Sequence, residues 1–122
     1  MIRERGSVSV LLAVSVVVVL VLTMGVADVG RVILARSKAR TAADAAALAA
    51  ADELALPTGT DPATLAAEYA ARNGATLTAC ICDVGTFEAD VAVTVHVEGL
   101  LLFPGARDAV ARARAVVDLP SG

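Results

Sequence analysis

Residues 7–27, SVSVLLAVSVVVVLVLTMGVA, decide the fold of this chain because they form 21 consecutive residues without a charge. At a rise of ~1.5 Å per residue, a helix of that length extends about 31 Å, which matches the ~30 Å hydrocarbon core of a bilayer. In lipid, a single segment can satisfy its own backbone N–H and C=O groups only as a helix. We therefore predict one transmembrane helix over residues 7–27.

The same stretch has two other interpretations. Residues 1–5 supply a basic start, and Gly25-Val26-Ala27 has the small residues of a signal-peptide cleavage site. A domain secreted after cleavage near Ala27 is therefore an alternative, although the apolar region of a signal peptide usually spans only ~7–15 residues. A buried core helix is the other, but the rest of the chain is too short to cover a helix that is apolar on all sides.

The composition limits the classes of function. Of the 122 residues, 57% are hydrophobic but only 2% are aromatic, so the core must be built from Val, Leu and Ala. Residues 1–40 hold six basic and two acidic side chains, whereas residues 41–122 hold four basic and eleven acidic ones. Phosphate binding needs positive charge, so we do not expect nucleic acid as a partner. We also expect no small-molecule substrate.

The helical pattern continues beyond the apolar stretch. No proline lies between Ile2 and Leu56, and alanine, the best helix former, fills residues 39–51. We predict one helix over about residues 8–54, with Asp28 and Arg31 one turn apart and able to pair at the membrane edge. Its alanine-rich face could receive another helix or pack on its own domain.

The rest of the chain predicts one short helix and about three antiparallel strands. Asp61 is placed as an N-cap before Pro62, and Gly74 ends the second helix after Asn73. From Ala75 the apolar period becomes two, which predicts strands. The fold class is therefore α+β. The residues that we expect in the core of the first two strands are Leu77, Ala79 and Ile81, then Phe87, Ala89, Val91, Val93, Val95 and Val97. In the last run Ala111, Ala113, Ala115 and Val117 alternate with Val110, Arg112, Arg114 and Val116. A helix remains the alternative for the last run, over residues 108–117, and residues 99–105 form an apolar connection before it.

We assign no catalytic, cofactor-binding or metal-binding residue. His96 could lie near Asp90, Glu98 and the cysteines, but Cys-x-Cys with one histidine lacks a fourth zinc ligand, so we interpret it as a surface residue. Cys80 and Cys82 would have Cα atoms about 6.5–7 Å apart in a strand, at the limit for a disulfide, so free thiols or an intermolecular bridge are favoured. Arg112 and Arg114 share a face, which favours cross-strand pairs with Glu88, Asp90 or Glu98 over a partner-binding patch.

The assembled pattern resembles the TadE-like family of tight-adherence (Flp-type) pilus assembly proteins. The resemblance is carried by Arg5-Gly6-Ser7 before the apolar stretch and by residues 35–51, ARSKARTAADAAALAAA. Asn73-Gly74-Ala75-Thr76-Leu77, Cys80, the valine strand and Ala111-Arg112-Ala113-Arg114-Ala115 are similar to an actinobacterial subgroup, the helicase/secretion-neighbourhood TadE-like proteins.

The resemblance implies a non-enzymatic, minor pseudopilin-like membrane component of a pilus or secretion apparatus, without cofactors. Its partners would be membrane lipid and other assembly proteins or like subunits. Processing between Gly6 and Ser7 is typical of prepilins, but Leu11 stands where they usually carry glutamate. Related proteins often have a cysteine at the start of the second helix, where this chain has residues 61–64, so Cys82 is the possible intrachain partner of Cys80.

The resemblance also implies an orientation in the plasma membrane. Residues 1–6 would be cytoplasmic, residues 7–27 transmembrane, residues 28–56 a helix extension, and residues 57–122 a small extracytoplasmic α+β domain. A membrane-tethered envelope binding module unrelated to pili is the rival interpretation.

Overall fold

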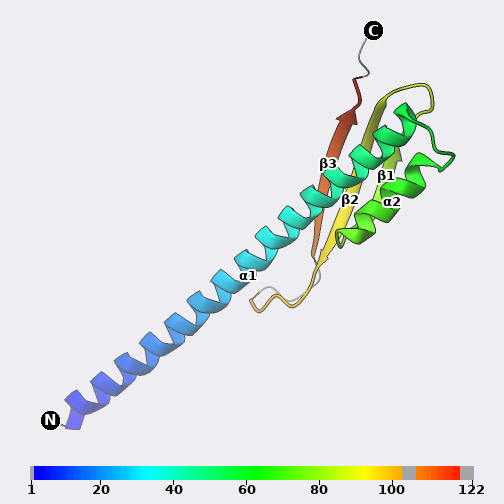
Figure 1. The fold of residues 1–122 in the computed structure, drawn as a ribbon. Helices are drawn as coiled ribbons and strands as arrows, with labels where there is room; N and C mark the ends of the chain where they lie inside the picture. Colours follow the sequence, from blue (N-terminus) through cyan, green and yellow to red (C-terminus); the bar gives the residue numbers. More distant parts are fainter. Residues whose placement is uncertain (1, 103–106, 119–122) are drawn as a thin grey trace.

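A computed structural model describes residues 2–102 and 107–118, and it has the predicted α+β architecture (Figure 1). The elements in chain order are α1 (Ile2–Ala55), α2 (Pro62–Arg72), β1 (Thr76–Ile81), β2 (Glu88–Val97) and β3 (Arg107–Val116). The N-terminal half of α1 projects as a rod, and everything else packs around its C-terminal half (Figure 1). We call this packed part, residues 28–102 and 107–118, the head.

The predicted single helix is confirmed, because α1 runs without a break from the apolar stretch into the head. Two hydroxyls inside the apolar stretch bond to their own helix. Ser15 Oγ donates to the carbonyl oxygen of Leu11 and Thr23 Oγ1 to that of Val19, each at 2.8 Å. Such bonds satisfy the two hydroxyl groups within the helix, so these side chains need no polar partner outside it.

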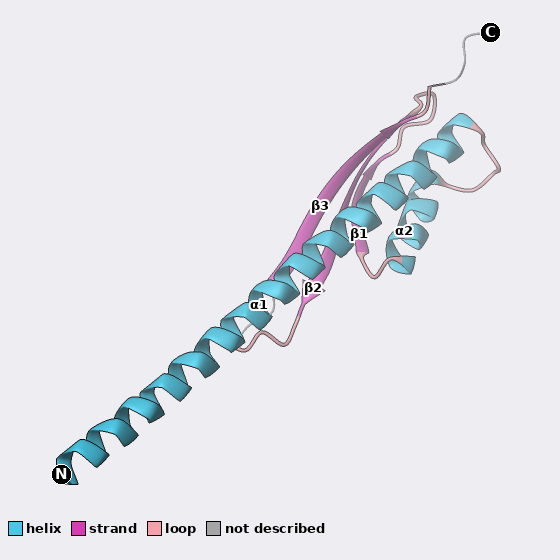
Figure 2. Ribbon diagram, turned by 60° about the vertical axis from the view of Figure 1, so that its left-hand side comes forward, coloured by secondary structure: helices cyan, strands magenta, loops and turns pink. Residues whose placement is uncertain are grey.

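The alanine face of α1 packs on its own domain, which answers the question that the sequence left open. Figure 2 shows the three strands running alongside the C-terminal half of α1, with α2 packed next to it. The sheet is antiparallel in the order β1-β2-β3. Alanine side chains let these backbones approach closely, so the core stays thin. The buried α1 residues of this core are Ala35, Ala39, Ala42, Ala43, Ala46, Ala47, Ala50, Ala51 and Leu54.

The short helix α2 begins and ends where the sequence predicts. The Asp61 carboxylate accepts a hydrogen bond from the backbone N–H of Thr64, which satisfies one free donor of the first turn. Gly74 follows the C-cap Asn73 with a φ of +77°, a conformation that side chains with a Cβ rarely adopt. Ala66 and Ala70 are the fully buried residues of α2.

The predicted alternation is confirmed in β2 and β3 but is wrong in the second half of β1. Odd-numbered residues of β2 are buried, and Ala111, Ala113, Ala115 and Val117 pack against the core. In β1 the register shifts between Leu77 and Ala79, so Thr78 is an extra residue relative to β2. Beyond a bulge of this kind, the side chains that would have faced the core point to solvent and the others point to the core. Ala79 and Ile81 are therefore exposed, and Cys80 packs against the core.

Two further predictions concern the ends of β2. Phe87, expected in the core, precedes the strand and is 43% exposed. Of the apolar connection predicted over residues 99–105, only residues 99–102 belong to the described part of the chain.

Candidate functional site at the junction of rod and head

The rod exposes an apolar surface on every side. All side chains from Val8 to Leu22 are exposed, and most of them are valine or leucine. Within the described chain, α1 is the helix that is long and apolar enough to cross a membrane, by length and composition.

Asp28 joins the head to the rod. Its side chain is only 2% exposed, although it lies one residue beyond the uncharged stretch. Oδ1 accepts a hydrogen bond from the backbone N–H of Leu101 at 2.6 Å, and Oδ2 accepts one from that of Leu102 at 2.7 Å. The sequence suggested Arg31 as the partner of this carboxylate, whereas these two donors lie 73 and 74 residues away in the chain.

Two close approaches complete the junction. A Cβ placed on Gly25 would lie 3.5 Å from Cδ1 of Leu102, so the leucine packs on the helix one turn before Asp28. Gly99 has a φ of +76°, and a Cβ there would lie 2.9 Å from Nη1 of Arg31. The absence of a Cβ at Gly99 therefore allows the positive φ after β2 and also leaves room for the Arg31 guanidinium.

The sequence of residues 6–53 matches the family model of the TadE/G-like Flp pilus-assembly proteins. Residues 6–53 are a TadE/G-like segment. The resemblance expected from the sequence is thereby confirmed over this part of the chain. No curated protein and no solved structure matches the chain.

The TadE/G-like segment covers nearly the whole of α1. It begins at Gly6, contains the exposed apolar rod and the junction residue Asp28, and ends at Glu53 in the last helical turn. The candidate processing residues Gly6 and Ser7 are exposed helical residues at its start. Inefficient or absent processing between them, expected because Leu11 replaces the prepilin glutamate, stays a prediction.

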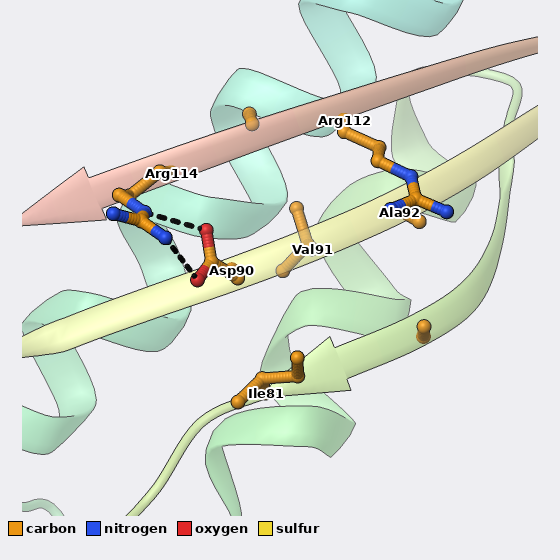
Figure 3. Close-up of a pocket in the computed structure, with 8 residues that line it drawn as sticks. Ile81, Asp90, Val91, Ala92, Arg112 and Arg114 are labelled. Carbon is orange, nitrogen blue, oxygen red and sulfur yellow. Dashed lines mark hydrogen bonds and ion pairs between the residues drawn. The ribbon is translucent and has the colours of Figure 1, made fainter.

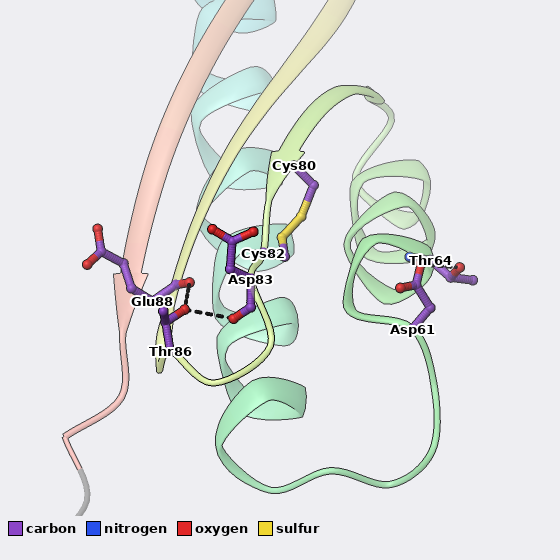
Figure 4. Close-up of a disulfide and its surroundings, with 7 residues drawn as sticks. All are labelled: Asp61, Thr64, Cys80, Cys82, Asp83, Thr86 and Glu88. Carbon is purple, nitrogen blue, oxygen red and sulfur yellow. Dashed lines mark hydrogen bonds between the residues drawn. A yellow bond between two sulfur atoms is a disulfide. The ribbon is translucent and has the colours of Figure 1, made fainter.

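Outside the TadE/G-like segment, Cys80 and Cys82 form a disulfide (Figure 4). Their Cα atoms are 5.6 Å apart, closer than the distance expected from an extended strand. The reason is that β1 ends at Ile81, so only Cys80 belongs to the strand and the chain bends before Cys82. The structure therefore joins the two cysteines within the chain, in place of the free thiols or the intermolecular bridge that the sequence favoured.

His96 lies on the exposed face of the sheet, as predicted, and the expected neighbour Glu98 is joined by Asp108 rather than by Asp90. Its Nδ1 lies 2.6 Å from Oδ1 of Asp108 on β3, and its Nε2 lies 3.5 Å from Oε1 of Glu98. The cysteines face the core side instead. Among the described residues, no three His, Cys, Asp or Glu side chains gather in a way that could hold a metal ion.

The predicted cross-strand pairing is confirmed for Arg114. Its Nε lies 2.9 Å from both Glu88 and Asp90, and Nη2 donates a second bond to Asp90 (Figure 3). The Asp90 hydrogen bond, followed by the charges of Asp90 and Glu88, raises the pKa of Arg114. Arg112 extends over Ala92 in the same open groove of ≈ 600 Å³ on the outer face of the sheet (Figure 3).

The sequence did not single out Glu53, which organises the loop after α1. Its carboxylate accepts hydrogen bonds from the Thr58 hydroxyl at 2.7 Å and from the backbone N–H groups of Thr58, Gly59 and Thr60 at 2.8–3.1 Å. The Thr58 hydroxyl is the largest cause that lowers the pKa of Glu53 below its ordinary value. An acidic residue three positions before Leu56-Pro57-Thr58-Gly59-Thr60 was the available signal.

Proposed function

We propose that this chain is a single-pass membrane component of a Flp-type pilus assembly apparatus, with a minor pseudopilin-like role. The observation that carries this proposal is the position of the TadE/G-like segment, which joins an exposed apolar rod to the alanine-rich core of the head. A helix with apolar side chains on all sides needs lipid or other apolar helices around it.

The proposed arrangement in the plasma membrane keeps the residue ranges expected from the sequence. Residues 1–6 lie in the cytoplasm, residues 7–27 cross the membrane, and the helix extension 28–56 and the domain 57–122 lie outside. The Cys80–Cys82 disulfide supports this orientation, because disulfides persist in oxidising compartments. The acidic head does not oppose it, since Asp and Glu contribute little to topology.

The basic residues after the span do not overrule this orientation. Arg31, Arg36, Lys38 and Arg40 slightly outnumber the basic groups before the span, which favours the head staying inside. However, the straight helix carries the last of them ~20 Å from the membrane, at ~1.5 Å per residue, which reduces their weight.

The proposed role is one of binding. TadE/G-like pilus-assembly proteins are generally non-enzymatic, and we propose that this chain likewise acts through contacts with other assembly proteins or like subunits. Cross-linking and affinity capture of a tagged chain from membranes of its host test this role. We expect the secretion ATPase and membrane platform proteins of the pilus apparatus to co-purify, and deletion of the gene to reduce pili.

The control is an unrelated single-pass protein with the same tag and expression level. Capture of the same proteins by that control, together with unchanged piliation after deletion, would contradict the proposed role.

A further inference from the structure

We propose that the loop of leucines after β2, residues 100–102, forms a second membrane contact, in which Leu101 and Leu102 insert into the bilayer interface beside the helical span. This inference rests on the proposed membrane anchor at residues 7–27. We call these three residues the leucine loop.

The leucine loop lies at the level where the span ends. Leu102 packs at Gly25, which precedes Ala27 by two residues, or ~3 Å along the helix. Figure 1 shows the connection after β2 at the end of the head that faces the rod, whereas the β1–β2 turn lies at the opposite end. If residues 7–27 cross a bilayer, the leucine loop must therefore lie at its surface.

The side chains of the leucine loop suit an apolar environment. Leu100 is half-buried and packs against the core of the head, whereas Leu101 is 54% exposed and Leu102 is 37% exposed. In water such neighbouring leucines leave apolar surface unburied, whereas acyl chains at the interface would cover it.

The backbone N–H groups of Leu101 and Leu102 also suit an apolar environment. A peptide N–H that enters the apolar layer without a partner is costly. The N–H groups of Leu101 and Leu102 both have a partner already, because each donates to one oxygen of the buried Asp28 carboxylate. Asp28 therefore lets the leucines enter lipid without exposing these two donors.

Arg31 provides a polar boundary on the other side of the loop. It lies four residues beyond Ala27, ~6 Å along the helix, and its guanidinium contacts Gly99 just before the leucine loop. At that height a guanidinium faces the lipid headgroups, where arginine is accommodated at a membrane edge.

Single-tryptophan fluorescence tests the proposal directly, because the chain contains no tryptophan. We would reconstitute full-length Leu101→Trp, Val17→Trp and Val84→Trp variants into vesicles whose acyl chains are brominated either near the headgroups or near the midplane. Val17 is central in the span, and Val84 is a 90% exposed residue of the β1–β2 turn. Leu102→Trp is a second reporter of the loop, and thermal unfolding identifies any variant that fails to fold.

We expect Leu101→Trp to lose fluorescence chiefly with the shallow bromine, with a blue-shifted emission. We expect Val17→Trp to lose it chiefly with the deep bromine and Val84→Trp to lose none. Quenched Val17→Trp with both loop reporters as unquenched as Val84→Trp would overturn the leucine-loop inference alone. Unquenched Val17→Trp would overturn the anchor and the inference together.

Discussion

Asp28 is the residue that fixes where the head sits along α1. Both of its carboxylate oxygens accept a backbone N–H from the segment after β2, so the helix and the end of the sheet are held at one height. Hydrogen bonds to a charged acceptor are stronger than those to a neutral one, and the low exposure of Asp28 protects them from water.

Replacement of Asp28 by asparagine should loosen this junction. The amide keeps one acceptor oxygen but turns an NH₂ group towards a backbone N–H, so one donor loses its partner. We expect the free energy of unfolding in detergent to fall by ~1–3 kcal/mol, the usual cost of a lost buried partner. Asp44→Asn, an exposed site on α1, is the control and should unfold like the wild type. An equal effect of both variants would argue against the role of Asp28.

Glu53 predicts a pH dependence of stability. Its hydrogen bonds, above all that from the Thr58 hydroxyl, lower its pKa in the folded state below the ordinary value of 4.5. Its contribution to stability is therefore fully present above pH 4.5 and is lost as the pH falls through the lower folded pKa.

We expect Glu53→Gln to lower the Tm at neutral pH, because the amide replaces one of two acceptor oxygens. The difference in Tm from the wild type should shrink as the pH falls below 4.5. Melting curves across this range for Glu53→Gln and for the exposed neighbour Asp52→Asn check the prediction. A Tm difference between Glu53→Gln and the wild type that stays constant with pH would contradict the prediction. So would an equal Tm difference for Asp52→Asn.

At the scale of elements, the thin alanine layer between α1, α2 and the sheet is the main packing feature. Ala66 and Ala70 of α2 belong to the same buried cluster as the alanines of α1. A well-packed layer of small side chains has no room for additional methylenes, so overpacking it forces the backbones apart.

Two adjacent alanines of α2 test this packing. Ala66 is fully buried, whereas Ala67 is exposed on the same helix. We expect Ala66→Leu to lower the free energy of unfolding by ~1–3 kcal/mol through overpacking. Ala67→Leu should stay within ~0.5 kcal/mol of the wild type, because it changes only the surface. Denaturant titration of both variants decides the point, and equal stabilities would refute the buried alanine layer.

Sequence periodicity predicted the elements well where a single local pattern decided them. The two helices and the alternation of β2 and β3 follow from residue spacing alone. The bulge at Thr78 could not be predicted in this way, because it depends on the pairing of β1 with β2 rather than on the residues of β1. The Asp28 junction was missed for a similar reason: its donors are backbone N–H groups, which carry no residue signature and lie far away in the chain.

The whole molecule is organised by one helix with two environments. The same α1 that exposes valine and leucine in the rod buries alanine in the head, and the TadE/G-like segment covers this transition. The orientation of the molecule then decides which compartment the head meets.

The two cysteines provide a test of orientation. We expect a membrane-impermeant thiol reagent to label the head on intact cells after gentle reduction, because the proposed orientation places the head outside. A Cys80→Ser, Cys82→Ser double variant should remain unlabelled, and lysed cells show whether the reduced thiols are accessible. Labelling that requires lysis would reverse the proposed orientation.

Alkaline carbonate extraction of host membranes, with the intact mass of the chain measured in each fraction, tests the membrane anchor most directly. We expect the chain to stay in the pellet, because no charge interrupts residues 7–27. We also expect its mass to be mainly that of the unprocessed chain, because Leu11 replaces the glutamate of prepilins. A mature chain that begins at Ser7 would contradict only the processing prediction. Release of the full-length chain into the supernatant, or a chain that begins at Asp28, would contradict the membrane anchor itself.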